Sequence, residues 1–167
     1  NIHPDSFMYF NAHLISESGL ENPAELWFKG EWTWSKFEEY TKQLQNYLNG
    51  KSTDTEKYYA LALGYPEFWI GSCASTGNGI ATVNGKAGRL NLKSPNVVQR
   101  LSAIQSLVQS GSYDKLRGVA DVAASFAQGK VAFHHGDLWF LKDPSRFDPT
   151  WTWKIGCVPY PTANNEG

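Results

Sequence analysis

The residues with the greatest capacity for chemistry in this chain are His134, His135 and Asp137, which lie within four positions of one another. Imidazole nitrogens and carboxylate oxygens bind zinc and serve as general acids and bases. Two positions beyond Asp137 stands Trp139, whose flat ring is suited to stacking against a sugar or another flat ligand. The stretch therefore predicts either a metal or catalytic site or a ligand-binding surface.

The two histidines are not arranged to hold one metal ion. They are adjacent on a strand, directly after the apolar residues 131–133, and neighbouring side chains of a strand point to opposite faces. The two cysteines, Cys73 and Cys157, are distant singles without a CxxC spacing, and we interpret them as small buried apolar residues. We therefore expect no metal site, no cofactor, and a polar strand end at His134 and His135, with one of them able to hydrogen-bond at the edge of a cleft.

Trp139 stands at a predicted junction between that strand and a helix beginning at Leu138. Ligands of α/β sheets bind outside the carboxyl ends of the strands, which makes Trp139 a candidate platform and Asp137 a candidate acceptor for sugar hydroxyl groups. Two other roles remain open. Asp137 is also suited to cap the helix at Leu138, and Trp139 could fill the core.

A second candidate loop follows the apolar run Tyr58–Leu63, which is short enough for a buried strand. Tyr65, Glu67 and Trp69 lie in this loop, again at the carboxyl end of a strand. They are candidate ligand-binding residues, and the alternative is an exposed loop with one buried ring.

The first third of the chain predicts a strand, two helices and a loop between the helices. The strand covers Phe7–Asn11, the first helix covers Ala12–Ser18, and Glu21–Trp32 is the loop. Thr33 is a good N-cap for the second helix, which we expect to end at Asn49-Gly50. Its apolar residues follow helical spacing: Trp34, Phe37, Tyr40, Leu44, Tyr47 and Leu48.

The rest of the chain continues the alternation. Asn84-Gly85 predicts a type I′ hairpin turn between two short strands within residues 80–92. Ser94 and Pro95 begin a helix that we expect to end at Gly111, with a last strand over Lys154–Val158. The expected apolar face of that helix holds Val97, Val98, Leu101, Ile104, Leu107 and Val108. The alternation indicates an α/β domain.

Composition excludes two classes of protein. The 167 residues suffice for one domain, and 15 basic against 16 acidic residues give a net charge of −1, without the basic excess of a nucleic-acid binder. No apolar run approaches the roughly 20 residues of a membrane-spanning helix.

Seven tryptophans, eight tyrosines and nine phenylalanines exceed what one core easily uses, so some rings should be exposed. Trp32 and Trp34 should pack the entry of the second helix, and one of Trp151 and Trp153 should be exposed.

Four stretches, taken in order, resemble the bacterial extracellular solute-binding proteins of ABC transporters, in particular sugar binders of the maltose-binding-protein type. The stretches are FMYFNAHLISESGLENPAELWFKGEWTWSKFEEYTKQL, YALALGYPEFWIGSCASTGNG, VNGKAGRLNLKSPNVVQRLSAIQSLVQSG, and DVAASFAQGKVAFHHGDLWFL with KIGCVPYP after it. The phrase Phe-x-x-Gly-Lys-Val-Ala, followed by a glycine and a tryptophan, is characteristic. The resemblance extends from about Phe7 to Pro161.

The resemblance implies an α/β fold of the periplasmic-binding-protein-like type II class, here a single lobe with a small central sheet flanked by helices. Residues 1–167 would form one domain, most of the second (C-terminal) lobe of a two-lobed protein, with the first lobe and the C-terminal part absent. Trp139 would stack on a carbohydrate, with an oligosaccharide as the expected ligand, and the loop of Tyr65, Glu67 and Trp69 would supply an acidic and an aromatic contact.

The resemblance also implies a location, an oligomeric state and partners for the protein. The protein would be extracellular, as a cell-surface lipoprotein or in the periplasm, and a monomer without catalytic residues. It would deliver its sugar to ABC-transporter permease subunits and would meet the membrane only through an anchor or that permease.

Two other functions remain open from the residues alone. A glycoside hydrolase needs two carboxylates roughly 5 to 9.5 Å apart across a cleft, and Glu67 and Asp137 are the acids placed at strand ends on one side. An independent carbohydrate-binding module is the other. Such modules are usually all-β, whereas this chain predicts at least three helices.

Overall fold

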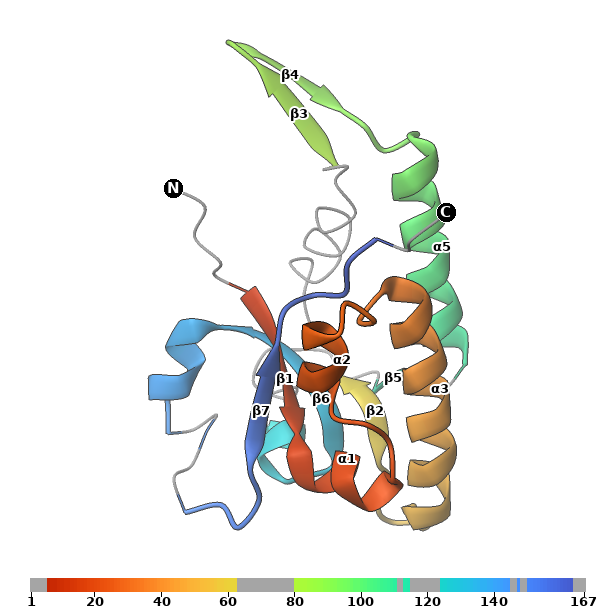
Figure 1. Cartoon of the computed structure of the whole chain (residues 1–167), viewed down its shortest axis with the longest axis vertical. Coiled ribbons are helices and arrows are strands. Elements are labelled where there is room, and N and C mark those ends of the chain that lie inside the picture. The colour runs from red at the N-terminus through yellow and green to blue at the C-terminus, as the bar shows by residue number, and fades with distance from the viewer. Residues whose placement is uncertain are drawn as a thin grey trace.

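The computed structural model of the chain (Figure 1) describes residues 6–62, 80–110, 113–114, 124–144, 147 and 150–163. The strands in these ranges are β1 (Ser6–Asn11), β2 (Tyr59–Ala62), β3 (Ala81–Asn84), β4 (Ala87–Leu90), β5 (Tyr113–Asp114), β6 (Val131–Asp137) and β7 (Ile155–Val158). The helices are α1 (Ala12–Ser18), α2 (Pro23–Phe28), α3 (Trp34–Lys51), α5 (Pro95–Gln109) and the 3-10 helix η1 (Leu138–Lys142).

Five strands form one mixed sheet in the order β5-β2-β6-β1-β7. β2 is parallel to both β5 and β6, whereas β1 runs antiparallel to β6 and β7. Helices α1, α2 and α3 lie against the sheet, and the β3-β4 hairpin projects away from it beyond the end of α5 (Figure 1). This arrangement confirms the expected α/β class with a small central sheet flanked by helices, and it excludes the all-β module.

The sheet separates two apolar clusters. Alternation along β1 sends Met8 and Phe10 into the larger cluster and Tyr9 into the smaller one. In the larger cluster, Phe133 of β6 stacks on Trp32 with ring centroids 6.0 Å apart. The other rings around Phe133 are those of Phe10, Phe37 and Tyr40. The smaller cluster lies on the opposite face of the sheet and holds Tyr9, Ala62, Phe126, Val131, Phe140 and Phe147.

The predicted end of the first helix at Gly19 and the predicted cap of the second helix at Thr33 are confirmed. The Asn11 carboxamide accepts the amide N–H groups of His13 and Leu14 at the start of α1, and α1 ends where Gly19 takes a left-handed backbone conformation. Thr33 caps α3 by accepting the Lys36 amide N–H. The tryptophans on either side of Thr33 are each 1% exposed, as expected for a packed helix entry.

The prediction of a loop over Glu21–Trp32 is wrong, because α2 occupies its centre. The Asn22 side chain accepts the amide N–H of Ala24, and Pro23 takes the first helical turn, where its missing N–H has no cost. The Asn-Pro pair is itself a signal for the start of a helix.

The hairpin is confirmed, but its turn lies one residue later than predicted. Asn84 pairs with Ala87, so the two central residues are Gly85 and Lys86. Gly85 has a φ of 60°, and no non-glycine residue in the described ranges has a positive φ. A positive φ at only the first central position belongs to a type II′ turn rather than type I′.

The helix ends also differ from expectation. α3 continues through Asn49-Gly50 to Lys51. Gly50 does not take the left-handed conformation with which a glycine ends a helix, because its φ is not positive. α5 begins at Pro95 as predicted and ends at Gln109, and Gly111 lies outside the described residues. Val98 was expected on the buried face of α5 but is 48% exposed.

Cys157 was interpreted as a buried apolar residue, and this is wrong. It lies exposed on β7, which among the described strands is at one edge of the sheet and pairs with β1 alone. Cys73 lies outside the described residues.

Gln45 completes the hydrogen bonding of β2 from within α3. Its Oε1 accepts the Ala60 amide N–H at 2.8 Å, and its Nε2 donates to the Tyr58 carbonyl oxygen at 3.0 Å. Gln45 is 4% exposed, so these two main-chain groups are satisfied by a side chain in place of a strand.

Gln45→Leu should lower the free energy of unfolding by about 2–4 kcal/mol, because two main-chain groups lose their partner in a buried place. Urea denaturation measures the change. Gln43→Leu is the matched control on the same helix, since Gln43 is exposed and bonds only to the exposed Glu39 among the contacts described for it. Equal effects of the two substitutions would contradict the role of Gln45.

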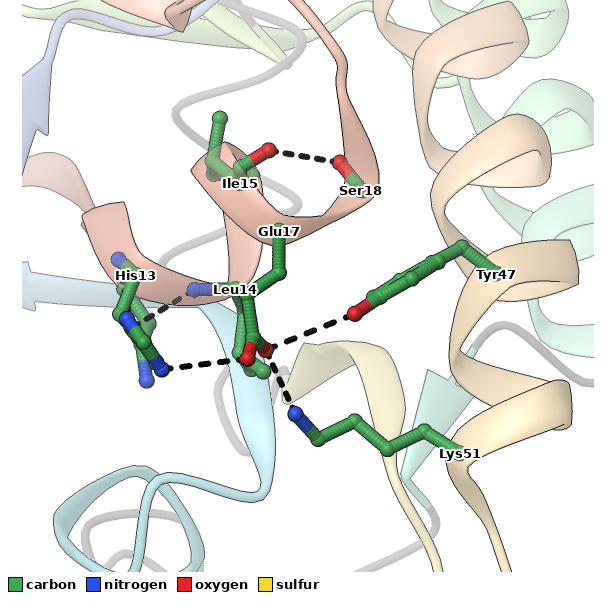
Figure 2. Close-up of polar contacts among 8 residues, drawn as sticks. His13, Leu14, Ile15, Glu17, Ser18, Tyr47 and Lys51 are labelled. Atoms are coloured by element: carbon green, nitrogen blue, oxygen red, sulfur yellow. Dashed lines mark hydrogen bonds and ion pairs between the residues drawn. The ribbon is translucent and has the colours of Figure 1, made fainter.

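A polar cluster joins α1 to the last turns of α3 (Figure 2). Glu17 accepts from Lys51 Nζ at 2.5 Å and from the Tyr47 hydroxyl at 3.5 Å, and His13 Nε2 lies 3.3 Å from its other oxygen. The hydrogen bond from Lys51 lowers the pKa of the Glu17 carboxyl below its usual value, and the same bond raises the pKa of Lys51.

The Glu17 cluster should contribute a pH-dependent increment of stability. Since the folded pKa of Glu17 lies below the unfolded one, the increment is present above the unfolded pKa and is lost as the pH falls through the folded pKa. Glu17→Gln should therefore lower the free energy of unfolding at pH 7 by about 0.2–1 kcal/mol, the range of exposed ion pairs, with the difference shrinking towards pH 3. Urea denaturation at both pH values tests this, and a difference that is unchanged at low pH would contradict it.

Candidate functional site

The candidate site lies where β6 leaves the sheet. The first six residues of β6, Val131 to Gly136, are buried, because the sheet is covered on both faces. Asp137 is half-buried, and the next two side chains, Leu138 and Trp139, are 49% and 54% exposed. The carboxyl end of β6 is therefore the point at which this central strand of the sheet first exposes side chains to solvent.

The Trp139 ring is exposed but held in place. Its Nε1 donates to Asp137 Oδ2 at 3.0 Å, and its ring meets that of Phe140 edge to face, with centroids 4.4 Å apart. Trp139 is 54% exposed, so the alternative in which it fills the core is wrong. An exposed aromatic ring fixed by a hydrogen bond at its edge is suited to stacking.

Asp137 stands at the N-cap position of η1 but does not cap it. Its side chain makes no capping hydrogen bond, and its carboxylate instead accepts the indole N–H of Trp139. The Asp137 carbonyl oxygen accepts from the Tyr9 hydroxyl at 3.0 Å. Burial, and then the nearby acidic groups of Cys157 and Asp137, raise the pKa of Tyr9 to about 12, so this donor stays protonated at neutral pH.

The loop with Tyr65, Glu67 and Trp69 lies outside the described residues, and their roles stay predictions. The strand before the loop is described. β2 ends at Ala62, which pairs in parallel with His134 of β6. The chain therefore leaves β2 at the same end of the sheet at which β6 delivers Asp137 and Trp139.

The two histidines lie on opposite faces of the sheet, as strand geometry predicts. His134 packs edge to face against Phe126 and Phe140 in the smaller cluster, and His135 stacks on Tyr160 near the larger one. They are 2% and 4% exposed, so neither lies at an open edge, and the expectation of a polar strand end is wrong. Within the described ranges, no group of three or more histidine, cysteine or acidic residues is close enough to hold a metal ion.

Tyr160 is the partner of His135 that sequence reasoning missed. Its hydroxyl lies 2.5 Å from His135 Nδ1, across 25 positions of the chain. No local pattern connects the two residues, because His135 lies on β6 and Tyr160 follows β7, and β1 separates these two strands in the sheet.

Trp151 and Trp153 form a pair on the outside of the smaller cluster. Their rings stack with centroids 4.4 Å apart and an interplanar angle of 15°, and both pack edge to face against Phe126. Both side chains are half-buried, so the expectation that one of them is exposed is wrong. The stacking covers one face of each ring.

Tyr160→Phe should lower the free energy of unfolding by about 1–3 kcal/mol, because it removes a hydroxyl group bonded to a buried imidazole. The matched control is Tyr47→Phe, whose hydroxyl makes a 3.5 Å contact with the exposed Glu17 and should change stability by less than about 0.5 kcal/mol. Urea denaturation compares them. A Tyr160→Phe variant as stable as the parent would show that the contact with His135 contributes nothing.

Among the described residues, no helix is both long and apolar enough to cross a membrane.

Comparisons with known proteins find similarity in structure only. No family profile matches the chain, and no curated protein matches it in sequence. The structure is similar to the ABC substrate-binding protein Lmo0181 from Listeria monocytogenes, solved in complex with cycloalternan, with a TM-score of 0.67, 18% identity and 96% of this chain covered. It is also similar to the GacH receptor of Streptomyces glaucescens, solved unliganded and with acarbose, with a TM-score of 0.63, 16% identity and 96% coverage.

The chain spans 38% of the length of each of these two proteins. The expected fold is therefore confirmed: this chain has the fold of part of an ABC substrate-binding protein, in the periplasmic-binding-protein-like class.

Proposed function

We propose that this chain is a ligand-binding lobe of an extracellular receptor that delivers a carbohydrate, most simply an oligosaccharide, to an ABC importer. The observation that carries the proposal is the exposed Trp139 ring, fixed by Asp137 at the carboxyl end of a central strand. The two similar structures named above support it, because one is an ABC substrate-binding protein in complex with cycloalternan and the other is a receptor in complex with acarbose.

In this proposal, Trp139 stacks on a sugar ring and Asp137 is a polar contact beside it. Tyr65, Glu67 and Trp69 complete this side of the site from the loop after β2. That β2 and β6 are parallel neighbours supports the grouping, because loops that follow parallel neighbours leave the sheet at one edge.

The proposed receptor has two lobes and a hinge, and this chain is most of the second lobe. Closure of the other lobe over Trp139 would bury the ligand, so this chain alone should bind weakly. The receptor works as a monomer, exported to the periplasm or held at the cell surface as a lipoprotein, with the permease subunits as its partners.

Binding should depend on Trp139. A thermal-shift screen of the full-length protein against acarbose, cycloalternan and linear maltosaccharides identifies a saccharide, and calorimetry then measures its affinity. Trp139→Ala should weaken binding by about 2 kcal/mol, or roughly 30-fold, as expected for a central aromatic contact, and Trp69→Ala should weaken it in the same direction.

Trp27→Ala is the matched control for Trp139→Ala. Trp27 is 38% exposed and packs edge to face against Phe28 on α2, a helix that does not adjoin η1 in the chain. It should leave the affinity unchanged. If Trp139→Ala and Trp69→Ala both bind as tightly as the parent, the proposed site is wrong.

The alternative is a glycoside hydrolase that uses Glu67 and Asp137. The Asp137 carboxylate already accepts the indole N–H of Trp139, which favours a positioning role over proton transfer. Incubating the full-length protein with labelled oligosaccharide separates the two functions. Turnover that is lost in both Glu67→Gln and Asp137→Asn would establish the hydrolase and overturn the proposal that the protein only binds.

A further inference from the structure

The exposed Trp139 ring depends on a neighbour that is itself buried. Phe140, the next residue of η1, is 5% exposed and turns back onto β6. Its ring packs edge to face against His134, with centroids 5.8 Å apart, and so joins the smaller cluster beneath the sheet. Phe140 therefore anchors η1 to the sheet.

Phe140 can take this place only because residue 136 is glycine. A Cβ added to Gly136 would lie 2.3 Å from Phe140 Cδ2 and 2.5 Å from Cε2. Carbon atoms in contact are normally about 3.5–4.0 Å apart, so the phenylalanine ring occupies the space of a side chain at position 136. We call this contact of Gly136 and Phe140 the seat of η1.

The Phe140 ring connects the seat to Trp139, because the Trp139 ring packs against it. The two rings meet at 81° with centroids 4.4 Å apart, while the Asp137 carboxylate holds the indole nitrogen. The contacts described for the Trp139 ring thus include a polar anchor at its edge and an apolar anchor at its side. Movement of Phe140 would remove the apolar anchor and shift the short helix that carries both rings.

We propose that Gly136 and Phe140 are positioning residues that set the direction of the Trp139 ring. The importance of this direction for ligand binding rests on the proposed function, whereas the direction itself is a property of the ligand-free protein. A platform that is ordered before the ligand arrives avoids the loss of side-chain entropy on binding. Gly136→Ala should therefore misplace the platform without removing it.

Gly156 provides a matched control. A Cβ there would lie 2.0 Å from Phe10 Cζ, so Gly156→Ala creates the same kind of clash. Phe10 belongs to the larger cluster, on the other face of the sheet from Phe140. Gly156→Ala should strain the protein without moving η1.

The experiment follows the Trp139 ring by fluorine NMR of the full-length, ligand-free protein labelled with 5-fluorotryptophan. The Trp139 signal is assigned by its loss in Trp139→Phe. We expect Gly136→Ala to shift or broaden this signal and Gly156→Ala to leave it in place. In a Phe140→Leu background, which removes the ring that the new Cβ would meet, Gly136→Ala should have little further effect.

A folded Gly136→Ala variant with an unchanged Trp139 signal would overturn the inference. If Gly136→Ala does not fold, Phe140→Leu alone decides, because loss of the apolar anchor should shift the Trp139 signal, and an unchanged signal would again overturn the inference.

The affinity for acarbose, or for another saccharide found in the screen, connects the seat to binding. Gly136→Ala should weaken binding about 10-fold or more, and Gly156→Ala less than about twofold, at a temperature at which both are folded. If the parent protein binds no saccharide, the proposed function fails, while the fluorine signals still test the seat. If the parent binds and Gly136→Ala changes neither signal nor affinity, the seat alone is wrong.

Discussion

The packing of Phe133 among aromatic rings is the interaction on which the rest of the structure depends. Phe133 lies on β6, the middle strand of the sheet, and Trp32 stacks on it while Phe37 and Tyr40 of the α3 region meet it edge to face. These contacts join the loop before α3, α3 itself and the sheet in one cluster. Because the smaller cluster covers the other face, β6 stays buried until its carboxyl end.

This burial explains why the exposed ring of the candidate site stands where it does. Trp32 and Trp139 are both indoles with a hydrogen-bonded Nε1, to the Pro159 carbonyl oxygen and to the Asp137 carboxylate. Trp32 is 1% exposed because helices and sheet enclose it, whereas Trp139 lies two positions beyond the last residue of β6. Among the described residues, the aromatic rings thus include enclosed ones that hold the sheet and exposed ones, of which Trp139 is fixed at the edge of the sheet.

The fold and the candidate site could be predicted to different degrees. The Thr33 cap and the Ser94-Pro95 start of α5 act within a few residues, and both helices begin where the sequence indicates. The same kind of signal at Asn22-Pro23 begins α2, although a loop is predicted there from the sequence. The hairpin turn lies one residue later than predicted, because Asn84 pairs with Ala87 in the ladder and Gly85 is the first central residue of the turn.

By itself the sequence determined the α/β class, the beginnings of α3 and α5 and the opposite directions of His134 and His135, since caps and strand alternation are interactions between near neighbours. Only the tertiary structure decided the burial of these histidines, the contact of His135 with Tyr160, and the exposure of Trp139. The physical reason is that burial depends on which distant segments cover a side chain. Because β6 is buried on both faces, its histidines are covered, whereas Trp139 lies beyond the end of the strand and is exposed. The spacing of these residues along the chain does not show this difference.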